Sequence, residues 1–277
     1  MHSKRQTKRA AGKTGVLILL IVFAIVEIFP FLWMLSVSFR TRVGIYDPGN
    51  LFGNLTLGNY QEIFDSGILK LFLNSFIVAI FSTLISLVLG TLAAYGFARF
   101  NWKKRESRAF WVLSQRFLPA MAVIIPYYLM GAVAGLLDTR IWLIICYIGF
   151  NLPFATWMMR GFIEDVPREL EESAMVDGCS RLAALRKVIF PLVLPGMVAT
   201  AIFCVINCWN EFVFANFLTT ISAKTVPVSV MTYLTVAGVK WGEMAATGIL
   251  AVLPVMIFAI AVQKYMIRGL TFGSVKG

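Results

Sequence analysis

Long apolar runs recur along this chain, and they restrict its possible folds more than any other feature of the sequence. The first run covers residues 15–39 and contains a single charged residue, Glu27. A helix of about 20 apolar residues crosses the hydrocarbon core of a bilayer, and it satisfies its own backbone hydrogen bonds there. Hydrophobic residues make up 59% of the chain, far above the share in a soluble domain. The sequence therefore predicts an all-α, polytopic membrane protein.

Six segments have the length and composition of membrane spans. Pro119 and Pro126 lie within the third of them and are expected to kink it, because a proline frees backbone carbonyls inside a helix. An apolar patch at residues 226–239 is interrupted by Pro227 and Gly238, so we expect a helix at the outer surface there instead of a span. The six spans are expected at about residues 15–39, 71–97, 109–134, 141–161, 192–217 and 244–262.

The second span carries a stripe of small residues. Gly90, Ala94 and Ala98 follow one another at four-residue spacing, which places them on one face of a helix. Small residues in such a stripe allow two membrane helices to approach closely. We therefore expect a neighbouring helix to pack tightly on this face.

The distribution of positive charge predicts how the spans are oriented. The net charge is +11, but the 25 Lys and Arg are spread over many loops and form no basic face, so no nucleic-acid partner is expected. With the N-terminus inside, eighteen of them fall in cytoplasmic segments and six in outer segments. Both ends are then cytoplasmic, as a basic tail at residues 1–14 and a C-terminal tail at residues 266–277. The first run is longer than a signal-peptide core and no cleavage site follows it, so we interpret it as an uncleaved span.

The most densely charged stretch, residues 165–191, lies between the fourth and fifth spans. Asp165 can cap a short helix whose first turn contains Pro167, and Gly178 tolerates the positive φ that ends a helix. Ser180 can then cap a second helix. The sequence predicts a helix, a glycine turn and a second helix on the cytoplasmic side.

This stretch resembles the EAA loop of bacterial ABC importer permeases, which usually reads Glu-Ala-Ala, three residues, Gly, nine residues, Ile-x-Leu-Pro. The matching residues are Glu172-Ser173-Ala174, Gly178 and Val188-Ile189-Phe190-Pro191, with departures at Ser173, Val188 and Phe190. Residues 93–99, 209–212 and 268–277 also resemble the smaller, MalG-like permease subunits of carbohydrate importers. The resemblance implies a type I, MetI-like fold for a permease domain at residues 15–265. The residues that would couple this domain to an ATPase are Glu172, Ser173, Ala174, Asp177, Gly178 and Pro191.

The same resemblance implies the partners and the activity. A permease of this kind is a non-catalytic, multi-pass subunit of the bacterial inner membrane. It pairs with a homologous second permease, two ATPase subunits and an extracytoplasmic solute-binding protein. ATP and Mg²⁺ are bound by the ATPases, so no cofactor is expected on this chain. The implied substrate is a sugar, an oligosaccharide or a polyol.

A few polar residues within the spans are candidates for the translocation path. Asn207, Asn210 and Glu211 lie toward the outer part of the fifth span and could bind hydroxyl groups, because amides both donate and accept hydrogen bonds. Hydrogen bonding between helices is the alternative role for them. Glu27 has either a structural ion pair or a place in the path, since a carboxylate inside a bilayer is unfavourable unless it is paired, protonated or solvated. Arg116 is interpreted as a structural residue that extends toward the inner surface.

Other functional classes find little support in the sequence. The only histidine is His2, and Cys146, Cys179, Cys204 and Cys208 form no metal-binding pattern, so packing is the expected role of the cysteines. The fragment 12–14 resembles the end of a P-loop but lacks its first glycine and a preceding strand. An ion-coupled secondary transporter remains the alternative, with Glu27 as its single basis. A membrane-embedded enzyme would need a nucleophile and base or a metal set, which is not visible.

Overall fold

The computed structural model describes residues 2–47, 49 and 54–271, and it describes side chains between residues 13 and 260. The chain divides into two compact units. One consists of Met1–Gly67 together with Val230–Leu253, and the other consists of Ile68–Ser229 together with Pro254–Gly277. Helices predominate in both units, as the sequence predicts.

The first unit contains a long apolar helix and several short elements. Asn59 donates its side-chain amide to the main-chain oxygens of Ser38 and Arg40, both at 2.9 Å, and thereby holds the turn after the long helix. The elements are α1 (His2–Ser38), α2 (Arg42–Ile45), α3 (Gly58–Asp65), the 3-10 turn η3 (Val230–Tyr233), the antiparallel strands β1 (Leu234–Thr235) and β2 (Gly238–Val239), and the first part of α13 (Trp241–Thr271).

Helix α1 is longer than the first predicted span. It begins at His2, so it extends through the basic residues that we expected as a separate tail at 1–14. Lys, Arg, Gln and Ala are good helix formers, and nothing in this segment ends a helix. The apolar side chains from Val16 to Trp33 are exposed, whereas Met34 is half-buried. Within this unit, Gly248 of α13 leaves room for Met34, whose sulfur would lie 3.0 Å from an added Cβ.

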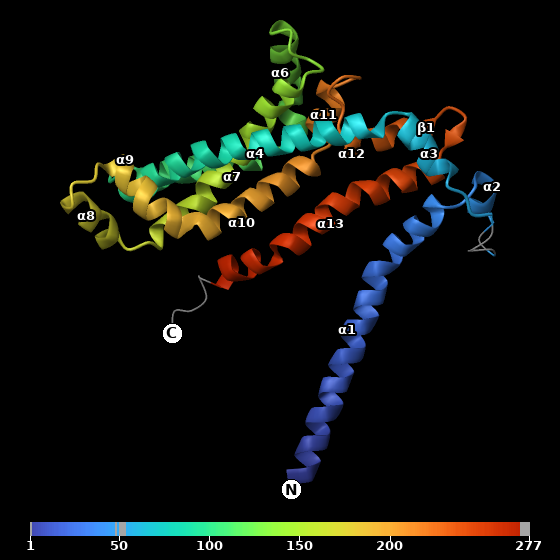
Figure 1. Cartoon of the computed structure of the whole chain (residues 1–277), viewed down its shortest axis with the longest axis horizontal. Helices are drawn as coiled ribbons and strands as arrows, with labels where there is room; N and C mark the ends of the chain where they lie inside the picture. Colours follow the sequence, from blue (N-terminus) through green and yellow to red (C-terminus); the bar gives the residue numbers. More distant parts are fainter. Residues whose placement is uncertain (1, 48, 50–53, 272–277) are drawn as a thin grey trace. The chain divides into compact units, whose positions relative to one another are not determined.

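Three long helices form the core of the second unit: α4 (Ile68–Arg99), α7 (Arg140–Glu164) and α10 (Phe190–Trp209) (Figure 1). The small-residue stripe of α4 faces α7. A Cβ added at Gly90 would lie 2.8 Å from the Cβ of Ala155, and both Ala94 and Ala98 are buried. The predicted close packing of the second span is therefore confirmed.

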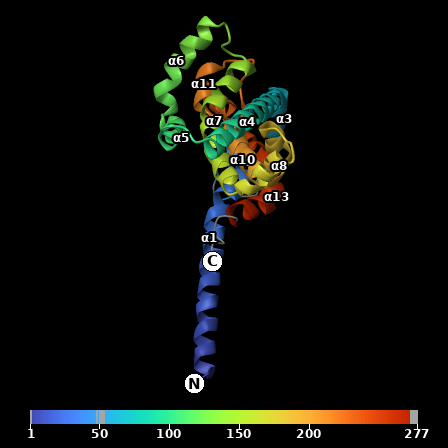
Figure 2. The same ribbon diagram turned by 90° about the vertical axis from the view of Figure 1, so that its left-hand side faces the viewer.

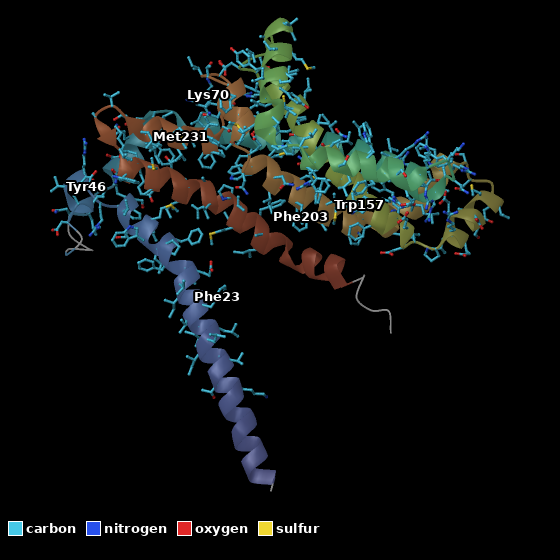
Figure 3. All side chains as sticks on the ribbon, turned by 180° about the vertical axis from the view of Figure 1, so that it is seen from behind. Phe23, Tyr46, Lys70, Trp157, Phe203 and Met231 are labelled. Atoms are coloured by element: carbon cyan, nitrogen blue, oxygen red, sulfur yellow. The ribbon has the colours of Figure 1, made fainter. Side chains whose placement is uncertain are left out.

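Helices α7 and α10 interlock through aromatic side chains. Phe203 of α10 meets Phe154 of α7 edge to face, with 6.1 Å between the ring centroids. Figure 3 shows Trp157 and Phe203 on these two helices. A Cβ at Gly196 would collide with the ring of Phe162, so a glycine is required for this helix contact.

The third predicted span, residues 109–134, is broken. It consists of α5 (Arg105–Ser114), the 3-10 turn η1 (Gln115–Phe117) and α6 (Ala120–Val133), and the helix axes meet at 88° (Figure 2). Leu118 is extended, with ψ 123°, because the residue before a proline is restricted to that region. Pro119 therefore ends one helix and caps the next, whereas Pro126 is accommodated within α6.

The fifth predicted span, residues 192–217, also differs from its expected bounds. Helix α10 ends at Trp209, and α11 (Val213–Leu218) follows after a short break. On the other side, α10 continues back without interruption through the π-helix η2 (Leu185–Ile189) and α9 (Arg181–Ala184). The second helix expected within residues 165–191 is therefore continuous with the fifth span, and Pro191 lies in the first turn of α10.

The outer patch and the last span differ as well. Residues 226–239 form α12 (Val226–Ser229), η3 and the β1–β2 hairpin instead of one surface helix, because Pro227 and Gly238 interrupt the helical pattern. Helix α13 starts before the predicted span 244–262 and ends after it, at Thr271. Residues 272–277 of the expected C-terminal tail lie outside the described residues.

Among the described residues, five helices are long and apolar enough to cross a membrane, and six spans result if the bent pair counts as one. This agrees with the predicted six-span membrane protein.

Candidate functional site

The polar segment between α7 and α10 folds as helix, glycine turn and helix. Helix α8 covers Arg168–Val176 with Pro167 as its N-cap, two residues after the expected cap Asp165, which lies at the C-cap of α7 instead. Gly178 has φ +91°, and its N–H donates to Met175 O at 3.1 Å. This is the left-handed turn that only glycine adopts readily.

The second helix starts where the sequence predicts. The Ser180 hydroxyl accepts the N–H of Ala183 at 3.3 Å and so caps α9. Cys179 donates its N–H back to Ala174 O, which completes the turn around Gly178. The predicted cap and the predicted glycine are therefore confirmed.

Helix α8 has an exposed face and an anchored face. Most of the expected coupling residues lie on the exposed side: Glu172, Ser173 and Asp177 are exposed and Ala174 is half-buried. Val176, next to them, is 88% exposed. Pro191 is also exposed, but it lies in α10 at a distance along the chain from this turn. An apolar and acidic surface of this kind is suited to contact with another protein.

The anchored face is held by a carboxylate that the sequence did not single out. Glu171 is 5% exposed and forms an ion pair with Arg99 of α4, with 2.9 Å between Glu171 Oε2 and Arg99 Nε. The Tyr95 hydroxyl donates to the other oxygen of the same carboxylate. Arg99 lies in the segment 93–99, which resembles the corresponding segment of carbohydrate permeases. The spacing of residues along the chain could not identify its partner.

A second ion-pair cluster joins α5 to α7 near the same end. The buried Arg160 of α7 donates through Nη2 to both carboxylate oxygens of Glu106 at 2.7 Å, and through Nε to Glu164 at 2.8 Å. The first half of the bent third span is therefore attached to α7 by charge.

A cavity of about 560 Å³ lies between the bent α5–α6 segment, α7 and the end of α10. Its polar lining comes from Gln115, Arg116, Tyr127, Asn207 and Glu211. Aromatic side chains form much of the rest of the wall: Trp111, Phe150 and Phe214. The cavity thus combines hydrogen-bonding groups with aromatic faces, as carbohydrate-binding sites do.

The structure brings some of the predicted path residues together and separates others. Asn207 and Glu211 line this cavity, whereas Asn210 is exposed at the C-cap of α10 and is not part of the lining. Glu27 lies on α1 in the other unit, where it is exposed. Arg116 was interpreted as structural, but it lines the cavity, with its guanidinium 4.4 Å from the ring centroid of Phe154.

Glu211 also caps a helix, a role that the sequence did not indicate. Its carboxylate accepts the Tyr147 hydroxyl at 2.8 Å and the N–H groups of Phe214 at 2.9 Å and Ala215 at 3.2 Å. It therefore caps the first turn of α11 and stabilises the break after α10. Both roles considered for Glu211, hydrogen bonding between helices and contact with the path, are compatible with this position.

The opposite end of the second unit is held together by Asn74 and Asp138. Asn74 donates to Ser222 O at 2.9 Å and Lys224 O at 2.8 Å, and it accepts from Arg140 at 2.7 Å. Partial burial acts to raise the pKa of Asp138, but four backbone N–H groups donate to its carboxylate and together hold the pKa well below its usual range. Those four groups belong to Ser222, Thr220, Ala223 and Ile221.

The cysteines pack inside the second unit. Cys146, Cys204 and Cys208 are buried, and the Asn151 amide lies 2.8 Å from Cys208 Sγ. Cys179 is half-buried at the turn beside Gly178. In the part of the chain that the structure describes, no three His, Cys, Asp or Glu side chains gather as a metal site would require.

Comparison with known proteins gives a consistent result. A family model described as "Binding-protein-dependent transport system inner membrane component" matches residues 86–272, more than half of the chain. The "Probable ABC transporter permease protein y4oR" of Sinorhizobium fredii is 37% identical and covers 100% of both chains. The "Sulfoquinovosyl glycerol transport system permease protein SmoH" of Agrobacterium fabrum is 34% identical, covering 90% of this chain and 89% of the relative.

A third relative and a solved structure extend this comparison. The "Trehalose/maltose transport system permease protein MalG" of Thermococcus litoralis is 33% identical, covering 93% of this chain and 94% of the relative. The crystal structure of a bacterial ABC transporter that imports the acidic polysaccharide alginate contains a chain that superposes with a TM-score of 0.78. That chain is 22% identical, and the match covers 94% of this chain and 97% of the other. At this identity the likeness shows a common fold.

Proposed function

This chain belongs to the family of binding-protein-dependent transport system inner membrane components, and from that premise we propose that it is the permease of a bacterial carbohydrate importer. Membership makes it a multi-pass membrane subunit of an ABC importer. The proposal adds a substrate class, the partners and the coupling residues. It places the chain in the bacterial cytoplasmic membrane, with both termini in the cytoplasm.

The substrate class is a sugar, an oligosaccharide or a polyol. Two relatives at 34% and 33% identity carry names that refer to sulfoquinovosyl glycerol and to trehalose and maltose. The cavity supports the same class, because its amides can bind hydroxyl groups and its aromatic faces can stack on sugar rings. Asn207, Gln115 and Trp111 are the side chains we assign to these contacts, and Glu211 contributes at the outer end.

The single observation that carries the coupling role is the exposed face of α8 beside the positive-φ Gly178. Glu172, Ser173 and Asp177 project from a short helix whose other face is anchored, so the segment is both rigid and accessible. In the proposal it docks on an ATPase subunit, which binds ATP and Mg²⁺ and performs all hydrolysis. A second, homologous permease contributes the matching surface, and an extracytoplasmic solute-binding protein delivers the substrate.

The transport cycle follows from this arrangement. Closure of the ATPases moves α8, and the packed helices α4, α7 and α10 carry the movement to the cavity, which opens to one side of the membrane at a time. The chain itself supplies no bond-breaking chemistry. Its residues position the path and transmit displacement.

The decisive experiment is copurification of the chain with its ATPase and a variant of the glycine turn. Gly178→Asp places a side chain at φ +91°, which distorts the turn between α8 and α9. We expect loss of the ATPase from the purified complex and loss of ATP-dependent uptake, with normal membrane insertion. Glu172→Lys should have the same effect by reversing an exposed charge on the docking face.

Gly135→Asp is the matched control, because Gly135 has φ +66° and no atom within 4 Å of an added Cβ, but it lies in the connection between α6 and α7. It should retain the ATPase. Equal loss of the ATPase in the Gly178 and Gly135 variants would show a general folding defect and would contradict the coupling role. Proton-driven uptake by the chain alone would favour a secondary transporter instead.

A further inference from the structure

Glu171 is a buried carboxylate whose contacts lie almost entirely on another helix. Its side chain and that of Arg99 are 7% and 5% exposed, and the two charges lie 2.9 Å apart. The Tyr95 hydroxyl satisfies the second carboxylate oxygen. A carboxylate out of water is strongly unfavourable unless it is paired and hydrogen-bonded, and here both conditions are met.

Two main-chain contacts reinforce this ion pair from both directions. Arg99 of α4 donates to Val166 O, just before α8, at 2.8 Å. Arg168 of α8 donates in return to Ala98 O at 3.1 Å. We call the four side chains Tyr95, Arg99, Arg168 and Glu171 the Glu171 clamp. The clamp connects the end of α4 to the start and the middle of α8.

Helix α8 also packs against α9 and η2, but neither of its connections to the chain is helical. On one side, Pro167 is extended with ψ 135°, and on the other Gly178 has φ +91°, so both ends of α8 are non-helical joints. Each joint absorbs rotation, because neither continues the i to i−4 hydrogen bonds of the adjacent helix. Continuity of the chain alone would therefore let α8 turn without moving α7 or α10.

By contrast, α4 is firmly packed beyond the clamp. Ala94 and Ala98 share a buried apolar cluster with Met159 and Ile163 of α7 and with Ile189 of η2. A displacement that reaches the end of α4 is thus transferred to all three core helices, since a densely packed interior deforms little.

We propose that the Glu171 clamp is the joint through which movement of α8 reaches the membrane helices, so that α8 and α4 move as one rigid body. Tyr95, Arg99 and Glu171 are positioning residues, and none of them is among the residues assigned to ATPase contact. The inference rests on the proposed function, because it takes α8 to be the element that the ATPase displaces.

The test measures the α8–α4 distance directly in the assembled complex in lipid nanodiscs. Spin labels are placed at Leu92 of α4 and Leu170 of α8, which are 49% and 46% exposed, after Cys179 is replaced by serine. Pulsed EPR distances are recorded without nucleotide and with Mg²⁺ and AMP-PNP. The unaltered clamp should give one narrow distance that is the same in both states.

Glu171→Gln keeps the shape of the side chain and removes its charge, and Tyr95→Phe removes one hydroxyl. We expect a second distance population, or a nucleotide-dependent shift, in Glu171→Gln and a smaller change in Tyr95→Phe. Glu169→Gln removes an exposed charge from the same helix and is expected to match the unaltered protein. If Glu171→Gln does not assemble, Tyr95→Phe decides the question alone.

An unchanged narrow distance in the clamp variants would overturn the proposal, as would a nucleotide-dependent distance in the unaltered protein. Failure of the proposed function is distinguishable from both results. If the proposed function is wrong, no ATPase copurifies with the chain. This result is obtained at purification, before any EPR distance is measured.

Discussion

Single carboxylates hold several elements of this protein in place, and Asp138 does so most completely. It accepts four consecutive backbone N–H groups from residues 220–223 at 2.9–3.2 Å. These bonds favour the charged carboxylate, so the pKa of Asp138 is depressed. The stabilisation of the folded loop is therefore fully present above the ordinary aspartate pKa, and it is lost as the pH falls through the depressed pKa. Protection of this loop should therefore not change between pH 8 and pH 5.

Asp138→Ala should loosen this loop measurably. Leaving several N–H groups without their acceptor costs roughly 1.5 kcal/mol or more, which corresponds to about tenfold lower hydrogen-exchange protection at residues 220–223. Hydrogen exchange read by mass spectrometry measures this in the purified protein. Glu62→Gln is the contrasting variant and should change hydrogen exchange little. The Glu62–Lys240 ion pair is exposed, and such pairs contribute about 0.5 kcal/mol or less after solvent screening. Wild-type protection in Asp138→Ala would refute the anchoring role.

At this scale the sequence identifies residue types better than residue roles. Asn207 and Glu211 were singled out and do line the cavity, since polar residues in a span are rare enough to notice. The capping role of Glu211 was missed, because nothing in the local pattern marks the break after Trp209. The partner of Arg99 was missed because Glu171 is distant along the chain, and only the fold brings the two together.

Elements pack here through glycines as well as through large side chains, and Gly90 of α4 is one such position. An alanine in a helix is about 1 kcal/mol more favourable than a glycine. At Gly90, however, the added Cβ would lie 2.8 Å from Ala155 Cβ and 3.0 Å from Thr156 N. Overpacking of this kind typically costs about 1–3 kcal/mol, so the steric term should exceed the gain in helix propensity.

We therefore expect Gly90→Ala to lower the thermal midpoint of the purified protein, whereas Gly96→Ala should leave it unchanged or raise it. Gly96 lies on the same helix, and its added Cβ would meet only Trp102, at 3.9 Å. Differential scanning fluorimetry in detergent compares the two variants directly. A higher midpoint for Gly90→Ala would show that α4 and α7 can separate without loss of packing.

The sequence predicts which segments form helices, but it does not predict where those helices break or continue. Hydropathy predicted the apolar segments along the chain, because it depends on composition over about 20 residues. The break at Leu118–Pro119 lies within a stretch that is apolar throughout, so composition cannot distinguish a kink from an 88° bend. Continuity also differs at residues 181–191, where the sequence predicts a separate second helix, whereas these residues form the first turns of the long helix that continues into α10.

For the whole molecule, the family and the six spans follow from long-range patterns that the sequence carries plainly. The cavity does not, since residues of α5, η1, α6, α7, α10 and α11 line it together. Part of its lining lies on both sides of the bend that composition could not predict. The proposed site of transport is therefore lined by the segment in which the structure departs most from the predicted fold.

This link gives a prediction about transport by the complete complex. Asn207 lines the cavity, and Asn207→Leu removes its hydroxyl-binding amide while keeping the branched shape of the side chain. We expect ATP-dependent uptake to fall about tenfold or more, as when a buried hydrogen bond to substrate is lost. Asn210→Leu, at the exposed C-cap of α10, should reduce uptake much less. Uptake of the sugar that the partner binding protein carries is measured in proteoliposomes, with complex assembly checked by size-exclusion chromatography. A larger loss for Asn210→Leu would place the path outside this cavity, at the mouth of the fifth span.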